Sequence, residues 1–168
     1  MEIKSHYQFN QRSKAMNQTE IRGDDPLAKF KELIKSRRFT DDEVMKLGDK
    51  LGRDLVGRAQ ENTTTQVRRF YNLVRSANTQ ALAKDADNNE ESTDEIVRIK
   101  LRTLQAQVTY AAARKTISNR FKTFFDASLD RIIGSKEIKK ELDAFTTFFE
   151  ALYAYFYYHA EQGKQPRR

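Results

Sequence analysis

The sequence predicts an all-α protein, a single-domain helical bundle of about five to six helices. Its 168 residues include only two prolines and six glycines, whereas good helix formers such as Lys, Glu, Ala, Leu, Arg and Gln are abundant. Apolar residues also recur at steps of three and four along most of the chain, which is the spacing of one helix face. A chain of this length can bury a core large enough to fold as one domain.

The chain begins with a segment that lacks this periodicity. Residues 1–23 are rich in Gln, Asn, Ser and charged residues, so we expect a flexible N-terminal arm before a helical domain over 24–161. Asp25 followed by Pro26 is typical of an N-cap and a first helical residue, and it predicts a helix to about Phe39. Residues 162–168 are expected to form a flexible basic tail.

A capping box, Thr40 to Glu43, opens a second helix that we expect to run to about Gln60. Gly48 and Gly52 lie about one turn apart inside it, and no phosphate-binding glycine pattern surrounds them. We therefore expect these two glycines to allow the close packing of a neighbouring helix.

The stretch TTTQVRRFYNLVR, residues 63–75, predicts a third helix from about Thr63 to Leu82. The apolar residues of its buried stripe are Val67, Phe70, Val74 and Ala77. Its three arginines fall clear of that stripe at about 100° per residue, so we expect them to face outward. They are Arg68, Arg69 and Arg75.

An acidic loop follows the third helix. Asp85, Asp87 and Asn89 imitate the first ligands of an EF-hand, but the turn position is Glu90 and the twelfth position is Ile96. An EF-hand needs glycine at the first of these positions and a bidentate Glu at the second, so we predict no calcium site.

Three more helices complete the prediction. A second capping box at Ser92 predicts a fourth helix to about Lys115. Ser118 and Gly134 are expected to cap a fifth helix at its two ends. Ser135 is expected to cap a sixth helix, whose aromatic residues at helical spacing we assign to the core in preference to base stacking. The width of its apolar seam indicates a central helix.

The net charge of +7 is unevenly distributed along the chain. Residues 62–84 and 96–125 contain no Asp or Glu, and they carry four and seven basic residues. The segment between them, 85–95, carries six carboxylates. Exposed helices usually mix the two signs to form i,i+4 pairs, so acid-free basic helices indicate a polyanionic partner. Merely solvated basic faces are the alternative interpretation.

The sequence offers no catalytic constellation, so we expect a protein that is not an enzyme and needs no cofactor. It has no cysteine, and its two histidines, His6 and His159, are far apart, so we predict no metal site. We expect His159 to be packed or hydrogen-bonded. No apolar run approaches the roughly 20 residues of a membrane-spanning helix, and the N-terminus lacks a signal-peptide core, so we expect a cytoplasmic protein.

Three segments carry motif-like patterns in order along the chain. TTTQVRRFYNLVR (63–75) contains Thr-x-Gln-hydrophobic-Arg, LQAQVTYAAARK (104–115) contains Tyr-x-Ala-x-Arg, and FTTFFEALYAYFYYH (145–159) is rich in phenylalanine. The matching residues are Thr64, Gln66, Val67, Arg68, Tyr110, Ala112, Arg114, Phe148, Glu150, Ala151, Ala154 and Tyr155. Together these segments resemble the signature segments of the small subunit of the type III-A CRISPR effector, the Csm complex, and the resemblance covers about residues 26–160.

Two places depart from that family pattern. Ala113 stands where the family often has glycine, so the approach of the backbone at that point is expected to differ. After Tyr155, the usual His-Lys is replaced by Phe156 and Tyr157, which weakens any role for His159 and leaves the arginines intact.

The resemblance implies a non-catalytic helical subunit, present in several copies, that lines the duplex of crRNA and target RNA beside the backbone and large subunits of the complex. A guide-programmed complex accepts any target sequence, so such a subunit should bind phosphates and A-form shape. Arginine suits this role because its planar guanidinium can bind phosphate in a bidentate manner. The RNA-binding residues that we predict are Arg68, Arg69, Arg75, Arg114, Lys115 and Arg120.

Three alternatives stay open on the sequence alone. They are a helical protein–protein adaptor without direct RNA binding, a peripheral membrane protein, and the analogous small subunit of the type III-B complex. RNA binding that is unchanged by charge reversal at Arg68 and Arg114 would favour the protein–protein adaptor. The arginine face of the third helix lacks large flanking apolar anchors, which disfavours the membrane alternative.

Overall fold

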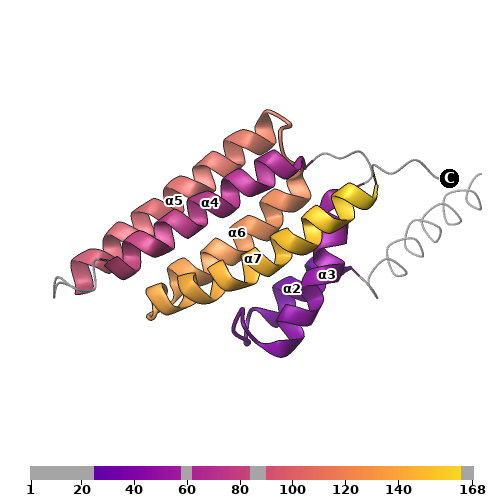
Figure 1. Ribbon diagram of the computed structural model, residues 1–168. Helices are drawn as coiled ribbons and strands as arrows, with labels where there is room; N and C mark the ends of the chain where they lie inside the picture. Colours follow the sequence, from indigo (N-terminus) through magenta and orange to yellow (C-terminus); the bar gives the residue numbers. More distant parts are fainter. Residues whose placement is uncertain (1–24, 58–61, 84–89, 164–168) are drawn as a thin grey trace, which may run out of the picture.

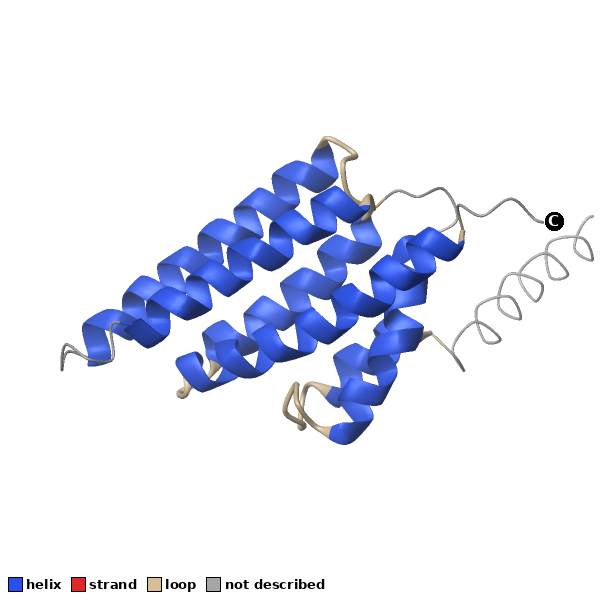
Figure 2. Ribbon diagram, viewed as in Figure 1, coloured by secondary structure: helices blue, strands red, loops and turns tan. Residues whose placement is uncertain are grey.

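The computed structural model describes residues 25–57, 62–83 and 90–163. These residues form six helices and no strand, which confirms the all-α prediction (Figures 1 and 2). The helices are α2 (Pro26–Leu33), α3 (Asp42–Val56), α4 (Thr64–Ala83), α5 (Glu90–Ala113), α6 (Asn119–Gly134) and α7 (Ile138–Gln162). The predicted N-terminal arm, most of the predicted C-terminal tail and most of the acidic loop lie outside the described residues.

The bundle is arranged around α7. Figure 1 shows α4 and α5 as a long hairpin on one side, α6 and α7 beside it, and α3 against the C-terminal half of α7 with α2 next to α3. Helix α7 packs against α3, α4, α5 and α6, which confirms that it is central. None of the helices in the described ranges is long and apolar enough to cross a membrane.

Phenylalanine makes up most of the core. Every phenylalanine in the described residues is at most 1 % exposed. They are Phe30, Phe39, Phe70, Phe121, Phe124, Phe125, Phe145, Phe148, Phe149 and Phe156. The rings of Phe145 and Phe149 on α7 contact those of Phe124 and Phe125 on α6, with centroids 5.8–6.3 Å apart. Core packing is therefore confirmed for the phenylalanines of α7, whereas Tyr155, Tyr157 and Tyr158 are exposed.

Several predicted caps are present. Asp25 accepts a hydrogen bond from the Leu27 amide at 3.0 Å, with Pro26 as the first helical residue. Ser118 accepts one from the Phe121 amide at 3.0 Å and so begins α6. The N-cap of α3 is Asp41 instead of Thr40, because the Asp41 carboxylate accepts from the Glu43 amide at 3.0 Å. Helix α4 lies within one residue of its predicted bounds.

The first predicted helix is too long. It was expected to reach Phe39, but α2 ends at Leu33. The chain turns there and places the Phe39 ring in the core, 5.0 Å from the ring of Phe145. The Arg131 guanidinium on α6 donates to the Ile34 carbonyl and so satisfies the end of α2. Burial of one ring thus overrides a locally helical pattern.

Other helix boundaries also differ from the prediction. Helix α3 ends at Val56, before Gly57 with a positive φ of 68°, whereas Gln60 lies outside the described residues. Helix α5 begins at Glu90, so the prediction that Ser92 is its N-cap is wrong. The predicted end at Lys115 is two residues late, because α5 ends at Ala113.

The junction between α6 and α7 is built differently from the prediction. Gly134 is the last helical residue of α6, and the C-cap Ser135 is extended, with φ −78° and ψ 146°. The prediction that Gly134 caps the C-terminal end of this helix is therefore wrong, because Ser135 occupies the C-cap position. The N-cap of α7 is Glu137, whose side chain makes no capping hydrogen bond. The Ser135 hydroxyl accepts a hydrogen bond from the Glu137 amide at 3.0 Å, just before the helix begins.

Gly52 sets the distance between α3 and α7. A Cβ atom at Gly52 would lie 2.9 Å from the backbone nitrogen of Phe156 and 2.9 Å from the Cβ of Tyr155. At Gly48 the nearest atoms, in the Tyr155 ring, would be 3.6 Å away. The expected close packing of a neighbour on these glycines is confirmed, and Gly52 is the tighter contact.

Because backbone cannot move aside as a flexible side chain can, we predict that Gly52→Ala lowers the free energy of unfolding by about 1–3 kcal/mol. The matched control is Gly134→Ala, since nothing lies within 4 Å of a Cβ there. That control should be neutral or should stabilise by up to about 1 kcal/mol. Urea denaturation followed by circular dichroism measures both, and equal effects of the two variants would contradict the prediction.

Candidate nucleic-acid interface

The predicted outward orientation of the α4 arginines is confirmed. Val67, Phe70, Val74 and Ala77 are at most 7 % exposed, whereas Arg68, Arg69 and Arg75 are exposed. The three arginines do not share one surface, however. Arg69 lies on the flank of α4 that faces α5. Arg68 and Arg75 lie nearer to α7, since Arg75 is close enough to influence the pKa of Tyr71, which packs on α7.

A groove runs between α4 and α5. Its hollow has a volume of about 510 Å3 and contains Arg69 from α4 and Arg114 from the end of α5. The other polar residues that line it are Gln66, Thr103, Gln107, Tyr110 and Thr116. No acidic side chain is among the described residues that line this hollow. The groove thus joins two cations that are 45 positions apart in the sequence.

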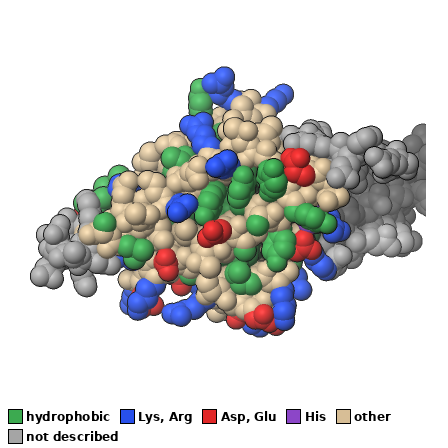
Figure 3. Space-filling model, in the orientation of Figure 1, with side chains coloured by type: hydrophobic (Ala, Val, Ile, Leu, Met, Phe, Trp, Pro, Cys, Tyr) green, Lys and Arg blue, Asp and Glu red, His purple; other side chains and the backbone are tan. Residues whose placement is uncertain are grey.

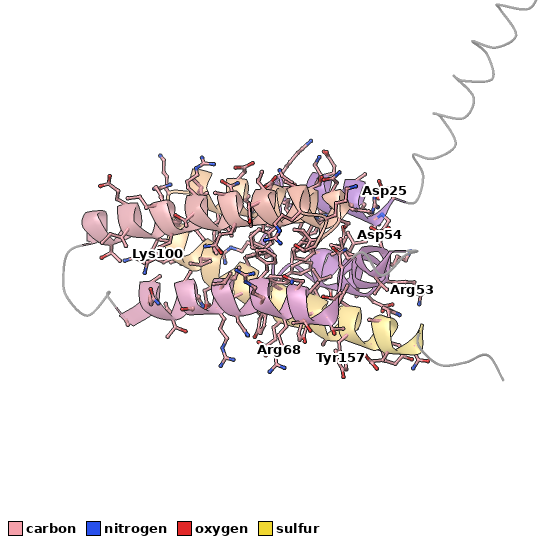
Figure 4. All side chains as sticks on the ribbon, turned by 90° about the horizontal axis from the view of Figure 1, so that it is seen from above. Asp25, Arg53, Asp54, Arg68, Lys100 and Tyr157 are labelled. Carbon is pink, nitrogen blue, oxygen red and sulfur yellow. The ribbon has the colours of Figure 1, made fainter. Side chains whose placement is uncertain are left out.

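The groove continues toward the far end of the hairpin. A second hollow of about 200 Å3 shares Thr103 and Gln107 with the first and adds Lys100 and Gln80. The Lys100 ammonium donates a hydrogen bond to the Gln80 side chain, and Figure 4 shows Lys100 between the two helices. From Gln66 to Gln80 the groove follows about 21 Å of helix α4, at about 1.5 Å per residue.

Arg114 is held in position by Tyr110, one turn earlier on α5. Its guanidinium donates to the Tyr110 hydroxyl at 3.1 Å and lies 5.6 Å from the centre of the ring. The Tyr110 side chain is 63 % exposed, so neither group is buried by this contact. A cation over an aromatic face loses some conformational freedom while its outer N–H groups remain available to a ligand.

The turn after α5 is strained at Lys115. The Thr116 amide donates to the Ala111 carbonyl at 3.0 Å, and the Lys115 amide donates to the Ala112 carbonyl at 2.9 Å. This is the Schellman pattern, in which the left-handed position is usually glycine. Here that position is Lys115, with φ 57°. A cationic side chain is therefore held beside Arg114 at a cost in backbone energy.

The sequence matches a protein-family model over most of its length. The model for Csm2 of type III-A matches residues 40–162, well over half of the chain. The chain belongs to the Csm2 type III-A family. It is therefore a small subunit of a type III-A Csm complex. No curated protein and no solved structure matches the chain. All three segments that carry the resemblance lie inside the matched range, whereas α2 precedes it.

The Csm2 fold divides the basic residues into two groups. Many are bound by carboxylates or carbonyls: Arg98 to the Ile133 and Ser135 carbonyls, Arg102 to Asp130, Arg120 to Asp25 and Asp54, Lys122 to Asp126, and Arg131 to Glu141. By contrast, Arg68, Arg69, Arg75, Arg114 and Lys115 have no carboxylate partner within the described part of the chain. The cations without a carboxylate partner in these ranges therefore include those of α4 and of the end of α5, together with Lys29, Lys31, Arg53 and Lys136 on other elements.

Arg120 differs from the other predicted site residues. Its guanidinium donates to the carboxylates of Asp54 and Asp25, and so joins α6 to the end of α3 and the start of α2. Burial raises the pKa of Asp25, but hydrogen bonds from Arg120 and from nearby amides, with the charge of Arg120, leave that pKa below its usual 3.8. Arg120 therefore braces the fold, and two carboxylates neutralise its charge.

Sequence reasoning missed several polar residues of the groove. Thr103, Gln107 and Tyr110 lie beside Arg114 on one face of α5. Their spacing of four, three and four is a helical stripe that could have been found in the sequence.

Asn62, outside the groove, was also missed. Its side chain donates to the Leu55 carbonyl at 2.6 Å and accepts from the Ser118 amide at 2.7 Å, which ties the start of α4 to α3 and α6.

No group of three or more His, Cys, Asp or Glu side chains in the described residues could hold a metal ion. The expectation for His159 is confirmed, because its ring is 10 % exposed and lies 2.6 Å from the Asp49 carboxylate. This pair joins α7 to α3 and belongs to the packing of the bundle.

We predict that Arg120→Met lowers the free energy of unfolding at pH 7 by about 1.5–3 kcal/mol, because charged hydrogen bonds are lost and two carboxylates lose their cation. Since the pKa of Asp25 is depressed in the fold, its contribution is present above pH 3.8 and is lost as the pH falls through the lowered value. The wild type should therefore lose more stability than Arg120→Met between about pH 5 and pH 3.

The control for Arg120→Met is Arg102→Met. The Arg102 ion pair with Asp130 is about 60 % exposed on both sides, so it should contribute at most about 1 kcal/mol. Urea midpoints at the two pH values measure both variants. A pH dependence of Arg120→Met equal to that of the wild type would show that Asp25 does not depend on Arg120.

We also predict that Lys115→Gly is more stable than Lys115→Ala by about 1 kcal/mol, because only glycine adopts a positive φ without strain. Both variants lack the cationic side chain, so the difference isolates the backbone. At the neighbouring helical position, Ala113→Gly should have the opposite sign and destabilise by about 1 kcal/mol. Thermal unfolding of the three variants measures these effects, and equal stability at position 115 would contradict strain there.

Proposed function

We propose that this Csm2 subunit binds RNA through phosphates along the groove between α4 and α5, without reading base identity. The observation that carries the proposal is the meeting of Arg69 and Arg114 in one groove that no described acid lines. Arg114 is at a motif position, whereas Arg69 follows the motif residue Arg68. Each cation projects from a different helix, so a backbone lying in the groove would be contacted from both sides. Lys115 follows Arg114 in the turn after α5, although it is not among the residues that line the groove.

The chemistry of the lining favours phosphate over base recognition. Arginine and lysine neutralise phosphates and release counterions, which gives affinity without sequence preference. Neutral polar side chains such as Gln66 and Thr103 can donate further hydrogen bonds to phosphate or ribose oxygens. A subunit that accompanies a guide-programmed duplex needs this behaviour, because base pairing already reads the sequence.

The RNA in this proposal is the crRNA with its target, in the cytoplasm, and the other partners are Csm subunits, including further copies of this chain. The role is non-catalytic. One copy offers few phosphate contacts, so binding by the free chain should be weak and should become strong when several copies act together. Arg120 is left out of the proposed contacts because Asp25 and Asp54 hold it.

The proposal predicts a salt dependence that the groove controls. For wild type, the logarithm of the affinity for an RNA duplex of arbitrary sequence should fall steeply with the logarithm of salt concentration. In Arg69→Gln/Arg114→Gln, the slope should flatten by about 1.4–1.8, which corresponds to two lost phosphate contacts. Fluorescence anisotropy at several salt concentrations gives both slopes, and a second duplex sequence should bind with nearly equal affinity.

The matched control is Lys31→Gln/Lys136→Gln, which removes the same net charge from exposed positions outside the groove. Its slope should stay close to that of the wild type. Equal flattening in both double variants would mean that net charge alone drives binding. No binding at low salt, with a folded protein, would favour the adaptor alternative, and flotation with anionic vesicles separates the membrane alternative.

A further inference from the structure

A row of tyrosine rings lies on the flank of α4 opposite the groove. Tyr71 on α4 is stacked on Tyr153 of α7, with centroids 5.7 Å apart and ring planes within 5°. Tyr153 is followed one turn later by Tyr157, at 6.4 Å and an angle of 54°. We call these three residues the tyrosine strip. Exposure increases along it, from 8 % at Tyr71, through a half-buried Tyr153, to 49 % at Tyr157.

Two of the uncompensated arginines flank this strip. Arg68 and Arg75 lie three residues before and four residues after Tyr71 on α4, so they are on its side of the helix. Figure 4 shows Arg68 and Tyr157 pointing out from the same edge of the molecule. In Figure 3, hydrophobic side chains, a class that includes tyrosine, gather on the face formed by α4 and α7, with Lys and Arg beside them.

Acids also lie near the strip, and Glu161 follows Tyr157 by four residues on α7. Burial raises the pKa of Tyr71, the Glu150 carboxylate raises it further, and Arg75 lowers it. Glu150 and Arg75 are therefore both close to the Tyr71 hydroxyl. Asp143 of α7 also reaches α4, because it accepts from the Asn78 side chain at 2.9 Å. Charges of both signs therefore lie on this flank.

The fold does not require the outer part of this strip. The phenylalanines of α7 are all buried, whereas Tyr157 and Tyr158 keep about half of their surface in contact with solvent. The hydroxyls of Tyr71, Tyr153 and Tyr157 have no hydrogen-bond partner within the described residues. Exposed aromatic rings beside arginines are the features that proteins use to hold unpaired nucleotides, by stacking on bases and pairing with phosphates.

We infer that the tyrosine strip, with Arg68 and Arg75, is a second nucleic-acid surface and that it takes a single strand. An unpaired base stacks on Tyr157, the most exposed ring, and the phosphates on either side lie at the two arginines. This surface is separate from the groove, since α4 lies between them. A duplex does not fit this chemistry because its bases are already stacked on one another. Every base has a π-face, so binding has little sequence preference.

The test uses the full chain and two probes, a short oligouridine with 5-iodouridine at one position and an RNA duplex. Irradiation couples the iodinated base to an aromatic ring in contact with it, and mass spectrometry of the wild type should locate the crosslink at Tyr157 or Tyr153. In anisotropy titrations, Tyr157→Ala should weaken oligouridine binding about five- to hundredfold, the loss of one stacked base. Tyr157→Phe keeps the ring and should retain binding within about twofold.

Two controls make the outcome specific. Tyr158→Ala removes a ring of similar exposure from the next position of α7, outside the strip, and should leave oligouridine binding unchanged. Duplex binding by Tyr157→Ala should also be unchanged, whereas Arg69→Gln/Arg114→Gln should weaken the duplex more than the oligouridine. Thermal unfolding checks that each variant is folded.

The inference is overturned if Tyr157→Ala binds oligouridine as the wild type does, or if crosslinks map only to residues outside the strip. Under either outcome a protein partner becomes the better explanation for the exposed tyrosines, since Tyr and Arg are also typical of protein interfaces. The proposal for the groove and the inference for the tyrosine strip can be refuted separately. Loss of duplex binding in the groove variant alone would sustain the proposed function without this second surface.

Discussion

The packing of aromatic rings along α7 is the constraint on which the rest of the structure depends. Phe145 and Phe149 meet the phenylalanines of α6, Phe148 stacks on Phe30 of α2 at 5.3 Å, and Phe149 also contacts Tyr71 of α4. On the remaining side, Gly52 lets α3 approach the backbone of α7. Replacing one such buried phenylalanine by alanine typically costs about 3–5 kcal/mol, so a single helix holds the other elements at fixed positions.

This scaffold explains how a strongly basic chain can be stable and still present unpaired cations at its surface. Carboxylates and carbonyls bind the cations at helix junctions, as for Arg120 with Asp25 and Asp54 and for Arg131 with Glu141. These ion pairs neutralise the arginines and join neighbouring helices. The cations of α4 and of the turn after α5 lack such partners within the described residues. At the surface, solvent screens the repulsion between these cations, and their charge remains available to a ligand.

Helix α4 then has a different chemistry on each flank. Toward α5, Arg69 and Arg114 face a groove lined by neutral polar groups. Toward α7, Arg68 and Arg75 lie beside stacked tyrosine rings. The two proposals assign paired RNA to the first flank and a single strand to the second. Two flanks of one rigid helix would allow the subunit to contact both without a change of conformation, because the core of α7 fixes their separation.

The sequence by itself determined the helices, the caps at Asp25 and Ser118, the outward direction of the α4 arginines and the family resemblance. All of these depend on residues within a few positions of each other, where helical periodicity and local hydrogen bonds decide the outcome. Only the tertiary structure decided that α2 ends early so that Phe39 is buried, that Arg69 meets Arg114, and that Arg120 is neutralised. The partners of Arg120 are 66 and 95 positions away, and no local pattern encodes such a contact. Charge and periodicity indicate which residues reach the surface, but the packing of distant helices decides which of them remain free to bind.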